Sequence, residues 1–92
     1  MAVLLLTYAL DKDGTSKADY TRFYKIRDTY DSVKLSESSY ALRTGDSPTA
    51  VYCNLKTNMD SNDYIYVTSL KRPYSGFGPK RVNDWLEKNL PD

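Results

Sequence analysis

Histidine is absent from this 92-residue chain, and Cys53 is its only cysteine. The missing imidazole excludes Ser–His–Asp triads, Cys–His pairs and histidine-ligated metals. Any catalysis must therefore use carboxylates, tyrosine, lysine or a hard metal ion. A lone cysteine can form neither an internal disulfide nor a zinc cage, which fits a reducing compartment and predicts a cytoplasmic protein.

The chain also lacks a dominant charge and a long apolar run. Thirteen Lys and Arg residues against twelve Asp and Glu residues give a formal net charge of +1, so no overall field attracts nucleic acid or a membrane. The N-terminal MAVLLLTYAL resembles the apolar part of a signal peptide, but it lacks a basic start and a small-residue cleavage site. No stretch approaches a membrane span. We expect one soluble domain, residues 1–92.

Hydrophobic periodicity predicts an alternating series of strands and helices. The expected strands are 3–10, 33–35, 40–43 and 64–71, and the expected helices are 17–30, one from residue 48, and 80–90. Ser16 and Asp19 form a capping-box pattern before the first helix, and Ser47 with Pro48 opens the second. The order βαββαβ is that of the ferredoxin-like unit. The prediction is an α+β fold with a four-stranded antiparallel sheet and an extra C-terminal helix.

The first expected strand also bears on quaternary structure. It is apolar on both pleat faces, yet both helices between the strands of this fold cover the same sheet face. A contiguous exposed apolar patch usually marks an interface. Either the C-terminal helix with Trp85 covers the second face or another copy of the chain does, and we predict a homodimer. The expected interface residues are Leu4, Leu6, Tyr8, Tyr64 and Tyr66.

A Gly- and Pro-rich stretch near the C-terminus mixes basic and aromatic residues. These residues are Lys71, Arg72, Tyr74, Phe77, Lys80 and Arg81. Cations can contact phosphates while rings stack on bases, which predicts contact with DNA or RNA. The alternative is an ordinary loop whose rings pack on the domain. Arg22, Lys25 and Lys34 form a second basic set.

Two carboxylates after the first strand, Asp11 and Asp13, are candidates for binding a hard divalent cation. They precede Gly14, and as a calcium loop this segment fails, because the first ligand position would fall on Ala9 and the twelfth on Tyr20. We favour a solvated Asp-Gly turn.

From Val3 to Asn89 the pattern resembles the small CRISPR adaptation proteins of the second Cas class and their free-standing, SinR-like relatives. The matching segments are LLLTYAL, SESSYALRT, the D-x-N-D turn at residues 60–63, and NDWLEKNL. The resemblance implies a homodimer that binds nucleic acid and, in some members, cuts it with a divalent metal. Metal-binding members carry an aspartate directly after the aromatic that ends the first strand. Here Ala9 follows Tyr8, so the resemblance implies that catalysis is lost.

Three hypotheses follow from these observations. The favoured one is a nucleic-acid-binding or adaptor homodimer without catalysis or cofactor. The second is a metal-dependent endonuclease with displaced carboxylates, which would need magnesium or manganese. The third is a small inhibitor or regulator that docks on a larger protein or ribonucleoprotein complex through its tyrosine-rich surface.

Overall fold

The computed structural model describes residues 1–10 and 20–92. Its elements are β1 (Ala2–Ala9), α1 (Tyr20–Arg27), β2 (Asp31–Ser36), β3 (Ser39–Thr44), α2 (Pro48–Lys56), β4 (Tyr64–Leu70) and α3 (Lys80–Asn89). This order confirms the expected βαββαβ series with a further C-terminal helix. The expected turn at Asp11–Gly14 and the capping-box pattern of Ser16 and Asp19 lie outside the described residues.

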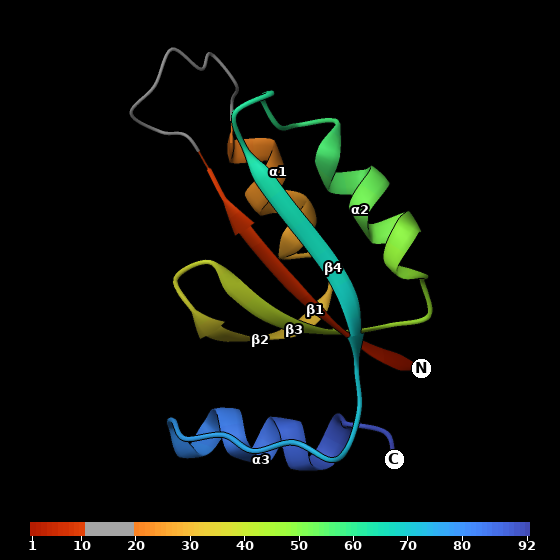
Figure 1. Ribbon diagram of the computed structural model, residues 1–92, viewed down its shortest axis with the longest axis vertical. Helices are drawn as coiled ribbons and strands as arrows, with labels where there is room; N and C mark the ends of the chain where they lie inside the picture. Colours follow the sequence, from red (N-terminus) through yellow and green to blue (C-terminus); the bar gives the residue numbers. More distant parts are fainter. Residues whose placement is uncertain (11–19) are drawn as a thin grey trace.

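The four strands form one sheet in the order β2-β3-β1-β4, and every neighbouring pair is antiparallel (Figure 1). The central strands are β1 and β3, as the ferredoxin-like arrangement requires. In the described part of the chain, β4 hydrogen-bonds to one neighbour, β1, and its other edge is open. No helix among the described residues combines the length and the apolar character that a membrane span needs.

Local sequence explains where α1 ends and where α2 begins. The Ser47 hydroxyl accepts a hydrogen bond from the Ala50 amide at 3.1 Å, and Pro48 occupies the first helical position, as predicted. The first helix ends at Arg27 rather than at the expected Tyr30. There the Thr29 amide bonds to the Ile26 carbonyl at 3.1 Å, and this i→i+3 bond tightens the last turn.

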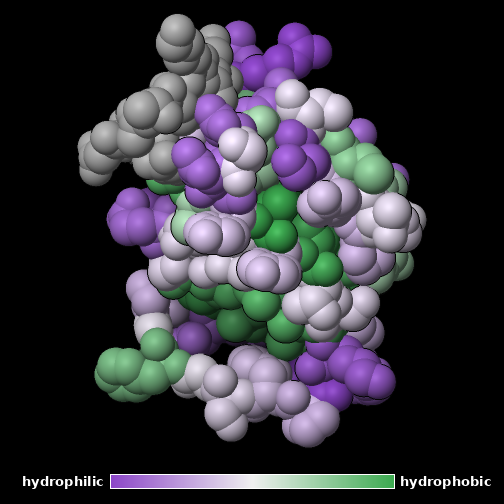
Figure 2. Space-filling view, turned by 45° about the horizontal axis from the view of Figure 1, so that its top comes forward, coloured by the Kyte–Doolittle hydropathy of each residue, from purple (hydrophilic) through white to green (hydrophobic). Residues whose placement is uncertain are grey.

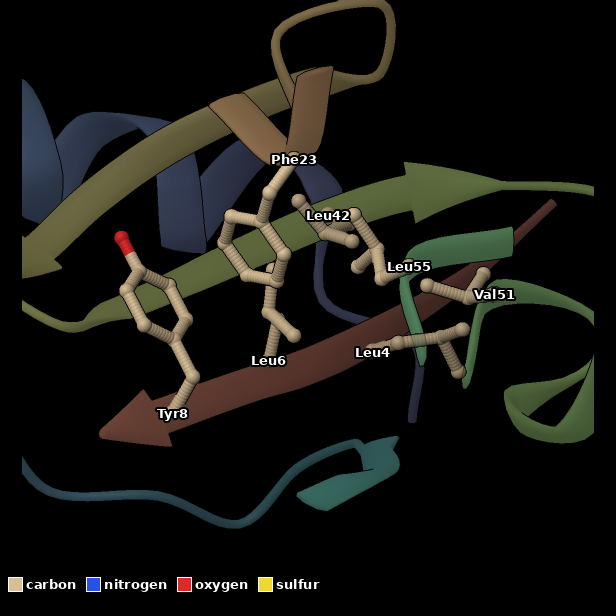
Figure 3. Packing of buried hydrophobic residues seen from close by; sticks show 7 residues of the cluster. All are labelled: Leu4, Leu6, Tyr8, Phe23, Leu42, Val51 and Leu55. Carbon is tan, nitrogen blue, oxygen red and sulfur yellow. The ribbon is translucent and has the colours of Figure 1, made fainter. Parts of the chain in front are cut away.

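One side of the sheet packs against α1 and α2 and forms the larger core cluster. Its buried members are Leu4, Leu6, Tyr8, Phe23, Leu42, Val51 and Leu55 (Figure 3). They come from β1, β3 and both helices, so burial of apolar area fixes the two helices on the sheet. The partly buried Ile65 and Val67 of β4 join this cluster, because alternate residues of a strand point to the same face of the sheet.

The other side of the sheet carries a second cluster, which α3 completes. Its buried members are Val3, Val33, Ala41, Val82 and Leu90, and the Trp85 side chain packs against them. The C-terminal helix therefore covers part of its own sheet. The sequence left open whether the C-terminal helix or another copy of the chain covers the second sheet face. Over this part of the face the cover is α3.

The expected dimer interface needs correction in three of its five residues. Leu4, Leu6 and Tyr8 point to the α1 and α2 side and are buried in the chain's own core. Strand side chains alternate, so the residues of β1 that could have lined the second face are Val3, Leu5 and Thr7 instead. Placing Leu4, Leu6 and Tyr8 at an interface was wrong.

Candidate functional site

A cavity of about 580 Å³ opens where β1 ends. Its walls come from the end of β1, from α1 and from the β2–β3 hairpin. The lining residues are Tyr8, Leu10, Tyr24, Arg27, Lys34, Glu37, Ser38 and Tyr40. Cavities of this size that combine apolar walls with a few convergent polar groups are the usual form of small-molecule sites.

The Arg27 guanidinium is the most constrained polar group in this cavity. Its Nη1 donates to the Tyr8 hydroxyl at 2.8 Å, and its Nε donates to a carboxylate oxygen of Asp28 at 2.9 Å. The guanidinium carbon lies 4.9 Å from the centre of the Tyr24 ring and 4.4 Å from that of Tyr40. Two cation–π contacts and two hydrogen bonds hold the planar fork in one orientation.

Tyr8 belongs to both the core and the cavity. Its ring meets the Phe23 ring edge-on at 4.9 Å and stacks on Tyr40 at 6.4 Å. The hydroxyl points away from the other labelled core residues (Figure 3). Burial raises the pKa of Tyr8, although the hydrogen bond from Arg27 opposes this effect, so the hydroxyl keeps its proton at neutral pH.

Among the described lining residues there is one more cation than anion, and Asp28, which is not in the lining, pairs with Arg27. Arg27 and Lys34 contribute two positive charges and Glu37 one negative charge, with the Lys34 ammonium 3.3 Å from the Glu37 carboxylate. Burial lowers the pKa of Arg27, but hydrogen bonds to Asp28 and Tyr8 outweigh this effect and raise it. Arg27 therefore stays charged. The cations of the described lining can bind an anion, and its one described carboxylate, that of Glu37, has no second described carboxylate in the lining for acid–base work.

Two of the C-terminal basic and aromatic residues make contacts within the chain. Arg72 donates to the Glu87 carbonyl at 2.6 Å and to its carboxylate at 3.2 Å, and the Tyr74 hydroxyl donates to the same carboxylate at 2.7 Å. The structure thus joins Arg72 and Tyr74 in an internal contact with α3. The hydrogen bonds from Tyr74 and Arg72 lower the pKa of Glu87, and the bond to Glu87 raises the pKa of Tyr74.

The other four predicted contact residues are spread along the same segment. The Lys80 ammonium lies 2.6 Å from the Asp84 carboxylate one turn along α3. Lys71 and Arg81 are exposed and form no ion pair with the residues that the structure describes. Phe77 is fully exposed. Nucleic-acid contact through this segment stays a prediction, with Lys71, Phe77 and Arg81 as its accessible members.

The open part of the second sheet face lies beyond the reach of α3. There Tyr64 and Tyr66 are 64% and 68% exposed, in cross-strand register with Ala9 and Thr7 of β1. In space-filling view, hydrophobic residues gather in the middle of the molecule and hydrophilic groups surround them (Figure 2). The outward direction of both tyrosines agrees with the sequence pattern. Whether they form an interface stays a prediction.

The metal candidates Asp11 and Asp13 lie outside the described residues. Over residues 1–10 and 20–92, no three Asp, Glu or Cys side chains come close enough to hold a metal ion. Ala9 is the exposed last residue of β1.

No function was predicted for Arg27, which shares a helical face with Phe23 and Ile26. A signal was available, because an arginine on the same helical face as Phe23 and Ile26 must find partners when it is buried. The sequence could not show that Tyr8 of β1 and Tyr40 of β3 lie beside Arg27, because both residues come from other elements.

No protein-family model matches the chain, and neither does any curated protein or solved structure. The resemblance to the small CRISPR adaptation proteins therefore stays a prediction from the sequence.

Proposed function

We propose that the chain is a non-catalytic homodimeric adaptor that binds nucleic acid. The observation that carries this proposal is the exposed surface of β4. Its sequence, YIYVTSL, contains no charged residue, although it forms an edge of the sheet among the described strands. Edge strands that stay unpaired usually carry charges, prolines or bulges that prevent association. A strand without these features is suited to pairing with another strand.

A second copy of the chain is a suitable partner for this strand. Antiparallel pairing of two β4 strands around Val67 places Tyr64 opposite Leu70 and Tyr66 opposite Thr68 in both halves. Such an interface is isologous, as two-fold symmetry demands. It pairs aromatic with aliphatic or β-branched side chains and brings no like charges together.

Exposed cations support the nucleic-acid part of the proposal. Arg22 and Lys25 of α1 and Lys56 of α2 have no ion-pair partner within the described ranges. The start of α1 and the end of α2 lie at the same end of the molecule (Figure 1), where the Tyr20 hydroxyl donates to Asp63 at 2.9 Å. A dimer would present each cation twice, which compensates for a net charge of only +1 per chain.

Two features favour a protein without catalysis of its own. The chain has no histidine, and an alanine methyl at position 9 cannot ligate a cation. The endonuclease alternative now depends on Asp11 and Asp13 alone. The regulator alternative uses the same tyrosine surface but a different partner, so the oligomeric state separates it from the adaptor.

Light scattering at micromolar concentration tests the dimer. The expected mass is twice the 10.5 kDa of one chain. The double substitution Tyr64→Ser and Tyr66→Ser should give a monomer, because it removes both exposed rings from the interface. Phe77→Ser is the matched control, since it removes an exposed ring from another segment and should leave the dimer intact. A monomeric wild type would contradict the dimer and favour the regulator.

A binding and cleavage panel tests the nucleic-acid part. Single- and double-stranded DNA and RNA are incubated with the protein, with and without magnesium or manganese. We expect retarded bands and intact nucleic acid. Replacing Arg22 and Lys25 by alanine should reduce the log–log salt slope by about 0.9 per lost phosphate contact. The same change at Lys71 and Arg81 tests the C-terminal segment. Absence of binding at physiological salt would overturn this part, and metal-dependent cleavage would favour the endonuclease.

A further inference from the structure

The cavity at the end of β1 has no role in the proposed dimer or in its basic surface. Its walls combine tyrosine rings with an arginine and a lysine, and its volume of about 580 Å³ lies in the range of sites for small organic ligands. The donors in this cavity indicate what kind of ligand it holds.

Arg27 has donors to spare. A guanidinium carries five N–H groups, and two of them are used by Asp28 and Tyr8. The other three N–H groups, all on the Nη atoms, have no acceptor among the residues that the structure describes. Among those residues, no buried side-chain nitrogen or oxygen atom lacks a hydrogen-bond partner. The Nη2 atom, which carries two of these N–H groups and makes no hydrogen bond in this part of the chain, therefore reaches solvent, and Arg27 lines the cavity. Because the fork is already fixed by two rings, it loses little entropy when a ligand binds.

Two hydroxyls lie beside the guanidinium. The Tyr8 oxygen accepts the bond from Arg27, which leaves its own proton available for a ligand oxygen. Ser38, in the turn between β2 and β3, is also a lining residue, and its side chain carries a second hydroxyl. The Lys34 ammonium lies at the same wall. Its contact with Glu37 is 3.3 Å long and exposed, so an anion of higher charge can compete with it.

We propose that this cavity binds a phosphate monoester, held by the free Arg27 N–H groups, the hydroxyls of Tyr8 and Ser38, and Lys34. A tetrahedral dianion has enough acceptor oxygens to use donors from several sides, and arginine matches its geometry in bidentate fashion. The Tyr24 and Tyr40 rings provide a wall for a planar group attached to the phosphate. The ligand is a nucleotide with a terminal phosphate, either free or at the 5′ end of a strand.

Four probes in a calorimetric titration separate the sources. They are inorganic phosphate, adenosine 5′-monophosphate, a single-stranded hexanucleotide with a 5′-phosphate, and the same hexanucleotide with a 5′-hydroxyl. We expect the 5′-phosphate to tighten binding of the hexanucleotide roughly tenfold or more, because charge-assisted hydrogen bonds to one terminal group are added. Tight binding of the mononucleotide alone identifies a free nucleotide as the ligand. The titrations with the two hexanucleotides rest on the proposed function, because they assume that the chain binds nucleic acid. The titration with adenosine 5′-monophosphate does not.

Two substitutions test the assigned donors. Tyr8→Phe keeps the ring in the core and removes one hydroxyl, and Arg27→Lys keeps the charge and removes the fork. Both should weaken binding of the phosphorylated probe and leave the hydroxyl-ended probe unchanged. Arg43→Lys is the matched control, because it changes an exposed arginine of β3 that lies outside both the cavity lining and the proposed basic surface, and it should leave the 5′-phosphate preference intact.

The outcomes distinguish this site from a structural role of Arg27. If Arg27 serves only to join α1 to the sheet, the substitutions lower the unfolding midpoint and no phosphorylated probe binds the wild type better than its unphosphorylated partner. That result overturns the proposal. If Arg27→Lys fails to fold, Tyr8→Phe still decides, because loss of one hydroxyl does not open the core. Equal preference for the 5′-phosphate in Tyr8→Phe and the wild type would remove Tyr8 from the site.

Discussion

The two faces of the sheet are covered in different ways. On one face α1 and α2 enclose a cluster that includes Phe23, Leu6 and Leu42, all without solvent exposure. On the other face the single helix α3 covers Val3 and Leu70 at one end, and Tyr66 at the other end stays exposed. The first face is therefore buried by two helices, whereas the second face is buried at one end and exposed at the other.

This difference indicates where stability and where binding reside. A fully packed face tolerates little change, because each lost methylene leaves a cavity among fixed neighbours. A partly covered face keeps apolar and aromatic surface available for a partner. The substitutions below are expected to be most harmful on the first face and progressively milder away from it.

Phe23→Ala should have the largest effect. It removes the largest fully buried side chain and the edge-on partner of Tyr8, so the free energy of unfolding should fall by about 3–5 kcal/mol. Urea denaturation measures this value. Phe77→Ala, which removes a fully exposed ring, should stay within about 0.5 kcal/mol of the wild type. Similar losses for both variants would contradict the assignment of the core.

Val82→Ala tests whether α3 packs on its own sheet. Val82 is buried against the second face, and removal of its methyl groups should cost about 2 kcal/mol. The measurement is again the urea midpoint, taken at several protein concentrations. No change in stability would show that α3 does not pack there, and a loss seen only at high concentration would mean that α3 covers a partner chain.

The sequence predicted the first face better than the second. Alternation in β4 and the stripe on α1 are local patterns, so the inward direction of Val67 and Phe23 could be read directly. In β1 both alternating sets are apolar, and nothing local says which set meets α1 and α2. Leu6 was therefore assigned to the wrong face. The faces became distinguishable only once α3 and its Trp85 were seen to pack beside Val3.

The candidate sites show the same limit. Arg72 and Tyr74 looked available for nucleic acid because their partner Glu87 lies more than a dozen residues away on α3, and only the packing of α3 brings it near. Arg27 looked like one more member of a helical stripe, since Tyr8 and Tyr40 reach it from other elements. Contacts between elements decide both cases, and periodicity within one element carries no information about them.

Ser47→Ala should have a smaller and purely local effect. The Ser47 hydroxyl satisfies the Ala50 amide in the first turn of α2, and loss of such a cap costs about 1 kcal/mol. Ser47→Asp is the rescue variant, because aspartate also caps well. Thermal unfolding of the three proteins measures the series. Equal stability of Ser47→Ala and the wild type would mean that the cap contributes nothing.

Glu87→Gln should have the smallest effect, and it should depend on pH. The hydrogen bonds from Tyr74 and Arg72 place the pKa of Glu87 below its ordinary 4.5. The folded protein therefore favours the ionised carboxylate, and this contribution is complete above pH 4.5 and is lost as the pH falls through the lower, folded pKa. The wild type should be slightly more stable than the variant at pH 7, and the difference should vanish in acid. A difference that grows in acid would contradict the contact.

The most direct test of the two-face account is hydroxyl-radical footprinting of the tyrosines, read by mass spectrometry at submicromolar and at high micromolar concentration. At the lower concentration Tyr64 and Tyr66 should be modified rapidly and Tyr8 slowly, because Tyr8 is 7% exposed and they are 64% and 68% exposed. At the higher concentration Tyr64 and Tyr66 should become protected as the proposed dimer forms. Modification of Tyr8 as fast as that of Tyr64 at the lower concentration would contradict the account, because Tyr8 would then not lie in the core beneath α1.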